Sequence, residues 1–387
     1  MRQADRDPGA DPITGAHWLD GADGHARPVR HAGGIGKPRP EHGPEHCPQH
    51  VPRAVRDARD ARGKLTRARV RLVAFLADDG PAVGLLTPAG RVVHLEAGPG
   101  GLDLALAEDG LPALLEEARA VAARVGENPT AGEARADLAS LPAVEFPGKV
   151  VCVGLNYADH VKEGGRVAPG QPLLFGKFAN AVIGDGEAIV RPEGTRALDL
   201  EVELGVVIGR RARRVDASRA MAHVAGYVVL NDVSARDWQG VPTALREGEH
   251  GDGQWLRAKG SDTFLPVGAD FATPDDVDPA AGLRIRSWRI PGTGPEAGTA
   301  LQMQDGSTAN LIWTIPELIE FISRQVTLEP GDLIATGTPA GVGAYREPPI
   351  FLEPGDRVRC QVDGIGTVEN PVVDWSDVPG DEDDEPA

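Results

Sequence analysis

From Val70 onward the sequence is a succession of short, apolar, β-branched runs, each closed by a turn rich in Gly, Pro or Asp. The first three runs are VRLVAFL, AVGLL and RVVHL, and each has the composition of a strand. The chain carries 49 Gly and 33 Pro, which predicts many turns and argues against a bundle of long helices. These features favour an α+β fold in which strands predominate.

The apolar pattern divides the 387 residues into four parts. Residues 1–68 are rich in His, Pro and Gly and are predicted to be a disordered tail, with collection of metal ions by its His residues as the alternative. Residues 69–147 are predicted to form a small α+β N-terminal domain. Residues 148–373 are predicted to form a larger, mostly β domain, which contains the candidate site residues. Residues 374–387 are expected to be an acidic tail.

Three segments carry helical signals. Residues 102–107 and 111–124 are rich in Ala, Leu, Glu and Arg, which favour helices. Thr314 and Glu317 have the spacing of a capping box at the start of a third helix. Apolar residues then repeat at helical spacing: Ile315, Leu318, Ile319 and Ile322. This helix is predicted to stop before the Glu-Pro-Gly-Asp turn at 329–332.

Charge and cysteine content exclude several classes of protein. The formal net charge of −18 argues against nucleic acid or an anionic membrane as the main partner, because either would repel an acidic surface. The three cysteines, Cys47, Cys152 and Cys360, lie far apart and suggest neither a disulfide framework nor a cysteine-ligated zinc site. No apolar stretch near the N-terminus is long enough for a signal or a membrane span. A cytoplasmic location is therefore expected.

Two carboxylates lie two positions apart in the strand-like run LDLEVELGVVIG. Side chains alternate along a strand, so Glu201 and Glu203 point to one face and Val202 to the other. Their neighbours are apolar, and burying two like charges together is costly unless a cation or a proton compensates. Asp232 ends another apolar run and can bring a third oxygen to the same place. Three such ligands suit Mg²⁺ or Mn²⁺, and Ca²⁺ less well, whereas Glu-x-Glu on the exposed face of an edge strand is the alternative.

Five motifs together resemble the fumarylacetoacetate hydrolase family. They are GLNYADHVKEGG at 154–165, LDLEVELGVVIG at 198–209, NDVSARDWQ at 231–239, AKGSDTFLPVG at 258–268 and TGTPAGVG at 336–343. Within the family, the sequence most resembles bacterial acylpyruvate and 2,4-diketo acid hydrolases. The resemblance implies a mixed β-sandwich roll, usually a homodimer, with Mg²⁺ or Mn²⁺ held at Glu201, Glu203 and Asp232. These are the same three carboxylates to which burial and alternation point.

A candidate proton-transfer pair lies in the first motif. Asn156 can cap a short helix on which His160 and Glu163 lie three residues apart, on one face. A carboxylate on one imidazole nitrogen leaves the other free to act as a base near neutral pH. A surface His and Glu on a charged helix is the alternative. The family resemblance implies a catalytic dyad at these positions, on a lid-like helix over the substrate.

The resemblance also implies roles for residues that the local pattern alone leaves as ordinary polar groups. Lys259 would stabilise an enolate or oxyanion. Four further residues would contact the substrate: Lys177, Gln239, Gly337 and Thr338. For Lys177, a structural ion pair is the alternative to an anion contact. Arg236 and Asp237 are interpreted as an ion pair with each other that supports the loop of Asp232.

The expected activity is metal-dependent hydrolysis of a carbon–carbon bond in a 2,4-diketo acid, which yields pyruvate or a substituted pyruvate and a carboxylic acid in aromatic or sugar catabolism. Decarboxylation of oxaloacetate and keto-enol or 2-hydroxymuconate-type isomerisation are alternatives, because relatives with similar metal motifs catalyse each of them. A catalytically silent protein that binds small oxo acids is a third reading. Long loops at 240–253 and 290–298 suggest a substrate bulkier than a simple acylpyruvate.

Overall fold

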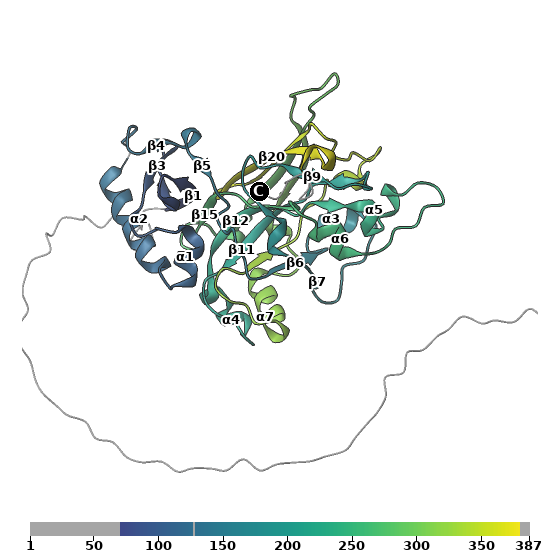
Figure 1. Ribbon diagram of the computed structural model, residues 1–387. Helices are drawn as coiled ribbons and strands as arrows, with labels where there is room; N and C mark the ends of the chain where they lie inside the picture. The colour runs from purple at the N-terminus through teal and green to yellow at the C-terminus, as the bar shows by residue number, and fades with distance from the viewer. Residues whose placement is uncertain (1–69, 127, 380–387) are drawn as a thin grey trace, which may run out of the picture. The chain divides into compact units, whose positions relative to one another are not determined.

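The computed structural model describes residues 70–379 apart from residue 127 (Figure 1). The tail predicted for residues 1–68 lies outside the described residues, as do the last eight residues of the acidic tail, 380–387. Within the described part of the chain, no helix is both long and apolar enough to cross a membrane.

The largest sheet has 11 strands. Its main path runs, in spatial order, through β4 (Glu133–Ala134), β3 (Arg91–His94), β2 (Gly80–Leu86), β1 (Arg71–Ala77), β15 (Asp270–Ala272), β12 (Val224–Asn231), β11 (Val202–Ile208), β18 (Leu333–Ala335), β6 (Val150–Gly154) and β7 (Leu173–Lys177), and β5 (Ala139–Ser140) pairs with β1. Every residue of β11 is buried, because strands flank it on both edges and protein covers both faces. This strand carries Glu203 into the interior.

The three strands predicted after Val70 are confirmed as β1, β2 and β3. They do not form a sheet of their own, because β1 pairs antiparallel with β15 and so continues the large sheet. Two helices, α1 (Gly101–Ala107) and α2 (Leu111–Val125), pack beside these strands (Figure 1). The N-terminal part therefore shares its backbone hydrogen bonding with the larger part.

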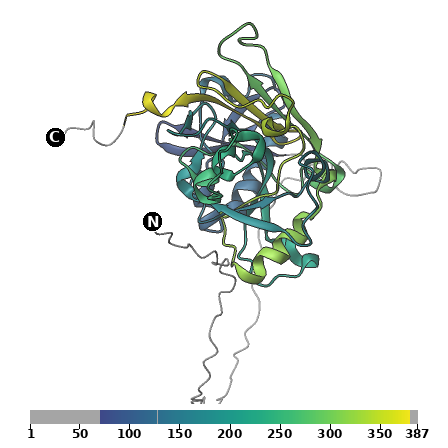
Figure 2. The same ribbon diagram turned by 90° about the vertical axis from the view of Figure 1, so that its right-hand side faces the viewer.

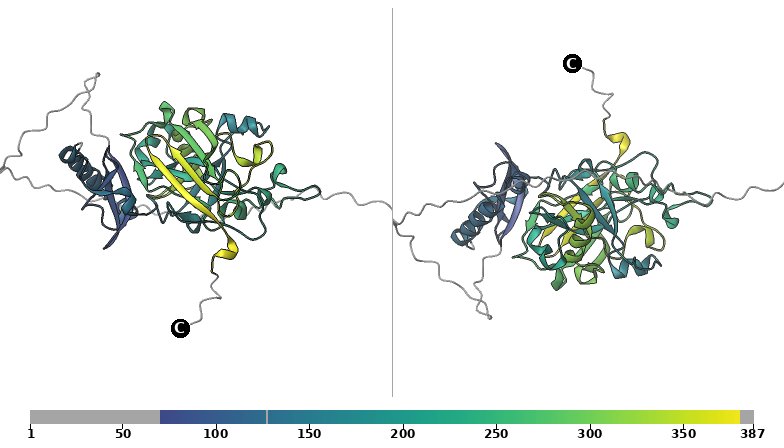
Figure 3. Two further views of the ribbon diagram at one scale, coloured as in Figure 1. Left: turned by 90° about the horizontal axis from the view of Figure 1, so that it is seen from above. Right: turned by 90° about the horizontal axis from the view of Figure 1, so that it is seen from below.

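A second sheet of five strands packs on one face of the first. In spatial order its strands are β17 (Leu301–Ser307), β16 (Arg284–Ile290), β19 (Arg357–Val362), β20 (Gly366–Asp374) and β9 (Ile189–Arg191). The yellow strands β19 and β20 cross the face of β11 and β12 (Figure 3). The predicted fold class is confirmed: the protein is mostly β, a sandwich of open sheets. Strand β20 reaches Asp374, and a helical turn follows at Trp375–Asp377, inside the segment predicted as the acidic tail.

Short elements complete the framework around the large sheet. They are the strand pairs β10 (Leu198–Asp199) with β13 (Ser234–Ala235) and β8 (Val182–Ile183) with β14 (Leu265–Pro266), and the helices α3 (Ala158–Glu163), α4 (Ala217–Ala220), α5 (Arg236–Gln239), α6 (Trp255–Gly260) and α7 (Ile315–Gln325). Figure 1 shows α3, α5 and α6 gathered at one end of the sheet. The capping box of Thr314 and Glu317 is confirmed at the start of α7, which lies at the end of the molecule opposite β20 in Figure 2.

Helix α7 is held mainly by its apolar stripe, so truncating that stripe should destabilise the fold. We expect Ile319→Ala to lower the free energy of unfolding by about 2–5 kcal/mol, because the side chain is fully buried and its loss leaves a cavity. Arg324→Ala, on the exposed side of the same helix, should change it by less than about 0.5 kcal/mol. Urea unfolding of both variants would measure this, and equal effects would contradict a stripe-dominated attachment.

Candidate metal and oxo-acid site

Pairing of β11 with β12 brings three carboxylates together. Val202 lies opposite Asn231 in the antiparallel register, so the residues beyond this pair, Glu201 and Asp232, become neighbours. The Asp232 backbone N–H donates to the Glu201 carbonyl at 2.9 Å. One carboxylate oxygen from each of Glu201, Glu203 and Asp232 lies within 4.8 Å of the other two, and all three residues are buried. The sequence predicted that these three carboxylates lie close together, and the structure shows that they do.

Glu203 is the least compensated of the three carboxylates. Its one hydrogen-bond donor among the described residues is the backbone N–H of Gly337, at 2.8 Å. Burial raises the pKa of Glu203 well above its usual range, and the neighbouring charges of Asp232 and Glu201 raise it further. An added cation would stabilise the ionised form of this buried carboxylate.

Glu201 has the opposite balance. Burial alone would raise the pKa of Glu201, but the adjacent cations Arg236 and Lys259 outweigh it and lower that pKa below its usual range. Arg236 Nη2 lies 2.5 Å from Glu201 Oε1, and Lys259 Nζ lies 2.6 Å from Glu201 Oε2. Glu201 is thus held ionised at the side of the site where the protein supplies its own positive charge.

Two lysines contact the third carboxylate, Asp232. Lys259 Nζ lies 2.7 Å from Oδ2, and Lys177 Nζ lies 2.7 Å from Oδ1. Lys177 also donates to the backbone carbonyl oxygens of Val233, Lys259 and Phe264. Its side chain is fully buried, and burial lowers the pKa of Lys177 despite the charge of Asp232. This geometry favours the structural ion pair over a substrate contact for Lys177.

The charges of the site leave room for a divalent cation. Four buried acids, Asp199, Glu201, Glu203 and Asp232, face three buried cations, Lys177, Arg236 and Lys259, so with every group ionised the cluster would carry one net negative charge. The excess lies at Glu203, which has no ion-pair partner within the described residues. All available ligand atoms are hard carboxylate oxygens, the donors that Mg²⁺, Mn²⁺ and Ca²⁺ prefer. A divalent cation therefore fits the residues present.

The predicted dyad is formed on α3. His160 Nδ1 lies 2.8 Å from Glu163 Oε1, and the other oxygen of Glu163 accepts the backbone N–H of Gly341 at 2.8 Å. The predicted cap is wrong: Tyr157 occupies the N-cap position, and Asn156 instead binds backbone groups of Trp313 and Thr336. The side-chain hydrogen bonds of Asn156 therefore connect the start of α3 to Thr336, which directly follows strand β18.

Arg236 has a larger role than the sequence indicated. The predicted ion pair between Arg236 and Asp237 is wrong: Asp237 accepts hydrogen bonds from the Thr195 hydroxyl and the Arg196 backbone N–H. Arg236 instead contacts Asp199 at 2.9 Å as well as Glu201. Asp199 was missed, although it precedes Glu201 by two residues and so continues the alternation of acids in LDLEVEL.

These groups surround a cavity of about 190 Å³. It is lined by His160, Arg166, Phe175, Glu201, Glu203, Asp232, Arg236, Gln239, Gly240, Val241, Trp255, Lys259, Thr338 and Tyr345, with Val153–Leu155 at one side. Of the predicted substrate contacts, Gln239 and Thr338 reach the cavity, whereas Lys177 and Gly337 lie behind the carboxylates. The cavity is smaller than the roughly 300–1,000 Å³ of sites for drug-sized ligands, which suits a small acid.

The long loops contribute little to this cavity. Only Gly240 and Val241 of residues 240–253 line it, and nothing in 290–298 does. The geometry therefore argues against the expectation that these loops accommodate a bulkier substrate.

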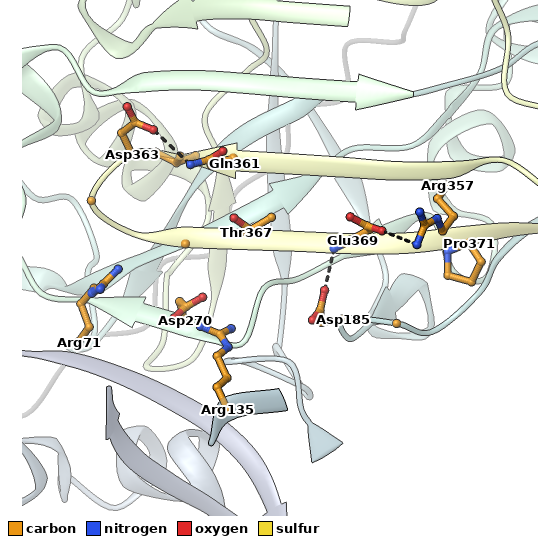
Figure 4. A pocket seen from close by; sticks show the side chains of 14 residues that line it. Arg71, Arg135, Asp185, Asp270, Arg357, Gln361, Asp363, Thr367, Glu369 and Pro371 are labelled. Carbon is orange, nitrogen blue, oxygen red and sulfur yellow. Dashed lines mark hydrogen bonds and ion pairs between the residues drawn. The ribbon is translucent and has the colours of Figure 1, made fainter. Parts of the chain in front are cut away.

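A larger cavity, of about 830 Å³, lies beside strands β1, β15, β19 and β20 (Figure 4). Its charged side chains mostly pair with one another: Arg135 with Asp270 at 2.7 Å, and Arg357 with Glu369 at 3.1 Å. It shares no lining residue with the carboxylate site. Size alone is therefore a poor guide here, and the smaller cavity has the convergent reactive groups.

Comparison with known proteins finds one matching family model and several similar proteins. Residues 149–373 match the family model described as the fumarylacetoacetate hydrolase C-terminal domain. The oxaloacetate tautomerase FAHD2A, mitochondrial, of Bos taurus is 41% identical over 299 residues, which cover 74% of this chain and 88% of that protein. The structure of 2-hydroxyhepta-2,4-diene-1,7-dioate isomerase from Mycobacterium marinum is similar with a TM-score of 0.56 and 33% identity, covering 79% of this chain and 99% of that one. The fumarylacetoacetate hydrolase from psychrophilic Exiguobacterium antarcticum is similar with a TM-score of 0.59 and 32% identity, at the same coverage.

Proposed function

Because the chain belongs to the fumarylacetoacetate hydrolase family, whose members are enzymes, we propose that it is a metal-dependent tautomerase that interconverts the keto and enol forms of a small 2-oxo acid such as oxaloacetate. The observation that carries the proposal is a small cavity lined by His160, which is hydrogen-bonded to Glu163, and by three clustered carboxylates that could hold an ion. The 41% identity to an oxaloacetate tautomerase supports this reaction over carbon–carbon hydrolysis, the activity expected from the sequence.

Tautomerisation requires one base and a site that stabilises an enolate. Glu163 accepts the hydrogen on Nδ1 of His160, which leaves Nε2 as the base. Nε2 takes a proton from C3 of the substrate, and the C–H electron pair becomes the C2–C3 double bond. The 2-oxo oxygen takes a proton from water, and Nε2 of His160 returns its proton to water. No atom is gained or lost. Glu163 stabilises the imidazolium that forms, and the Gly341 N–H keeps Glu163 in position.

Glu201, Glu203 and Asp232 would hold the ion, with Mg²⁺ or Mn²⁺ preferred to Ca²⁺ because the site offers few protein ligands. When bound, the ion would supply Lewis-acid polarisation of the 2-oxo group. Arg236 and Lys259 keep Glu201 ionised and oriented, so the ligand set is preformed. Lys259 also adds positive charge beside the developing enolate.

Hydrolysis of a 2,4-diketo acid is the second candidate. The same His160–Glu163 pair can deprotonate a water instead of a carbon acid, and a similar solved structure is named a fumarylacetoacetate hydrolase. The two reactions differ in product: hydrolysis consumes water and releases two acids, whereas tautomerisation leaves the carbon skeleton intact.

The experiment follows the enol absorbance of oxaloacetate and of acetopyruvate, with metal-free protein and then with Mg²⁺ or Mn²⁺, while products are identified by NMR. We expect metal-dependent equilibration of oxaloacetate enol and keto forms without loss of carbon. Formation of pyruvate and a carboxylic acid from acetopyruvate would favour the hydrolase. Release of carbon dioxide from oxaloacetate would favour a decarboxylase, and binding without turnover would leave only an oxo-acid binding protein.

Two expectations from the sequence remain predictions. A homodimer is implied by the family resemblance, and light scattering would measure it. The cytoplasmic location rests on composition, whereas the Bos taurus relative is designated mitochondrial.

A further inference from the structure

Arg166 is placed at the cavity by the way α3 ends. The Gly165 N–H donates to the Lys162 carbonyl and the Arg166 N–H to the Val161 carbonyl, at 3.1 and 3.0 Å, which is a Schellman motif. Gly165 has φ of +61°, the left-handed conformation that this motif demands and that glycine adopts without strain. The residue after it is therefore folded back beside the helix that carries His160. Arg166 lines the cavity from there.

The guanidinium of Arg166 is the uncommitted cation of the cavity. Arg236 is bound by Asp199 and Glu201, and Lys259 by Glu201 and Asp232. Among the described residues, no carboxylate or carbonyl oxygen lies within hydrogen-bond or ion-pair distance of the Arg166 side chain, which is exposed at the rim. A charge with five donors and no partner is free to bind a group on the ligand.

We propose that Arg166 binds the second, distal carboxylate of a dicarboxylic 2-oxo acid and so selects such substrates over monocarboxylic ones. The inference rests on the proposed function, which it deepens by naming the substrate class. A planar guanidinium matches a carboxylate with two parallel hydrogen bonds, which neither a methyl ketone nor an alkyl group can accept in that form. Phe175, Trp255 and Tyr345 also line the cavity, and their aromatic side chains supply no competing charge.

The test compares Arg166→Gln with wild type on oxaloacetate, which has the distal carboxylate, and on acetopyruvate, which has a methyl ketone there. We expect the KM for oxaloacetate to rise about 10-fold or more, as for a lost charge-assisted hydrogen bond, with KM for acetopyruvate within about 2-fold. Arg166→Lys should recover part of the loss, because it restores charge without the planar fork. Arg213→Gln, an exposed arginine away from the cavity, controls for the change in net charge.

Equilibrium binding of both acids to the Mg²⁺-loaded protein, measured by calorimetry, separates this inference from the proposed function. Selective weakening of oxaloacetate binding in Arg166→Gln supports the inference about Arg166. Absence of turnover of either acid by wild type would refute the tautomerase but would leave this binding result valid. Equal weakening for both acids, or no change for either, overturns the role of Arg166, whether or not tautomerase activity is found.

Discussion

Glu203→Gln is expected to lower the affinity for a divalent metal ion at least about 100-fold and to abolish metal-dependent activity. The metal-free variant should be no less stable than the metal-free wild type. The two effects have one cause. In the metal-free protein, three buried carboxylates offer oxygens within 4.8 Å of one another, and Glu203 has no cationic partner among the described residues. An amide of the same shape removes like-charge repulsion and still accepts the Gly337 N–H. It also removes the charge that attracts the ion.

Calorimetric titration with Mn²⁺ and thermal melts with and without the ion measure the two effects. The wild-type melting temperature should rise on addition of the ion, and that of Glu203→Gln should not. Glu193→Gln, an exposed glutamate away from the cavity, is the matched control and should behave as wild type. An unchanged Mn²⁺ affinity in Glu203→Gln would exclude Glu203 as a ligand.

His160→Ala should lower kcat about 10²–10⁴-fold without weakening metal binding, because it removes the base but no ligand. Glu163→Gln should have a smaller effect, since it keeps the hydrogen-bond geometry to His160 and Gly341 but no longer stabilises the imidazolium. The measurement is exchange of the C3 hydrogens of oxaloacetate with deuterated solvent, followed by NMR, beside a Mn²⁺ titration.

His94→Ala controls for loss of an imidazole, because His94 lies exposed at the end of β3 and outside the cavity. Full exchange activity in His160→Ala would show that another residue is the base. Loss of Mn²⁺ binding in the same variant would show that His160 acts on the site through structure rather than through proton transfer.

The choice between reactions is the part of the function that motifs could not supply. Tautomerase, isomerase and hydrolase all need an enolate-stabilising site, so the residues that signal the family, such as Glu201 and His160, would suit each of these reactions. The preference for tautomerisation comes instead from similarity over nearly the whole length of a relative, 88% of it. Selectivity then depends on rim residues such as Arg166, which lie outside the shared chemistry.

Local sequence patterns were enough to predict the β-rich class, the strands that carry the acids and the pairing of His160 with Glu163. These follow from local rules: alternation along a strand places Glu201 and Glu203 on one face, and a three-residue spacing on a helix brings His160 to Glu163. Burial of the acids was predictable because their neighbours are apolar.

The ion pairs between residues far apart in the chain depend on the tertiary fold. Arg236 contacts Asp199 and Glu201, residues 37 and 35 positions before it, and Lys177 bonds Asp232 across 55 positions, pairings that no local pattern encodes. Sheet register brings these groups together, and register is set by long-range packing of both faces of the sheet. Local spacing can therefore name candidate ligands, but the balance of charge that leaves Glu203 without a cationic partner among the described residues exists only in the folded protein.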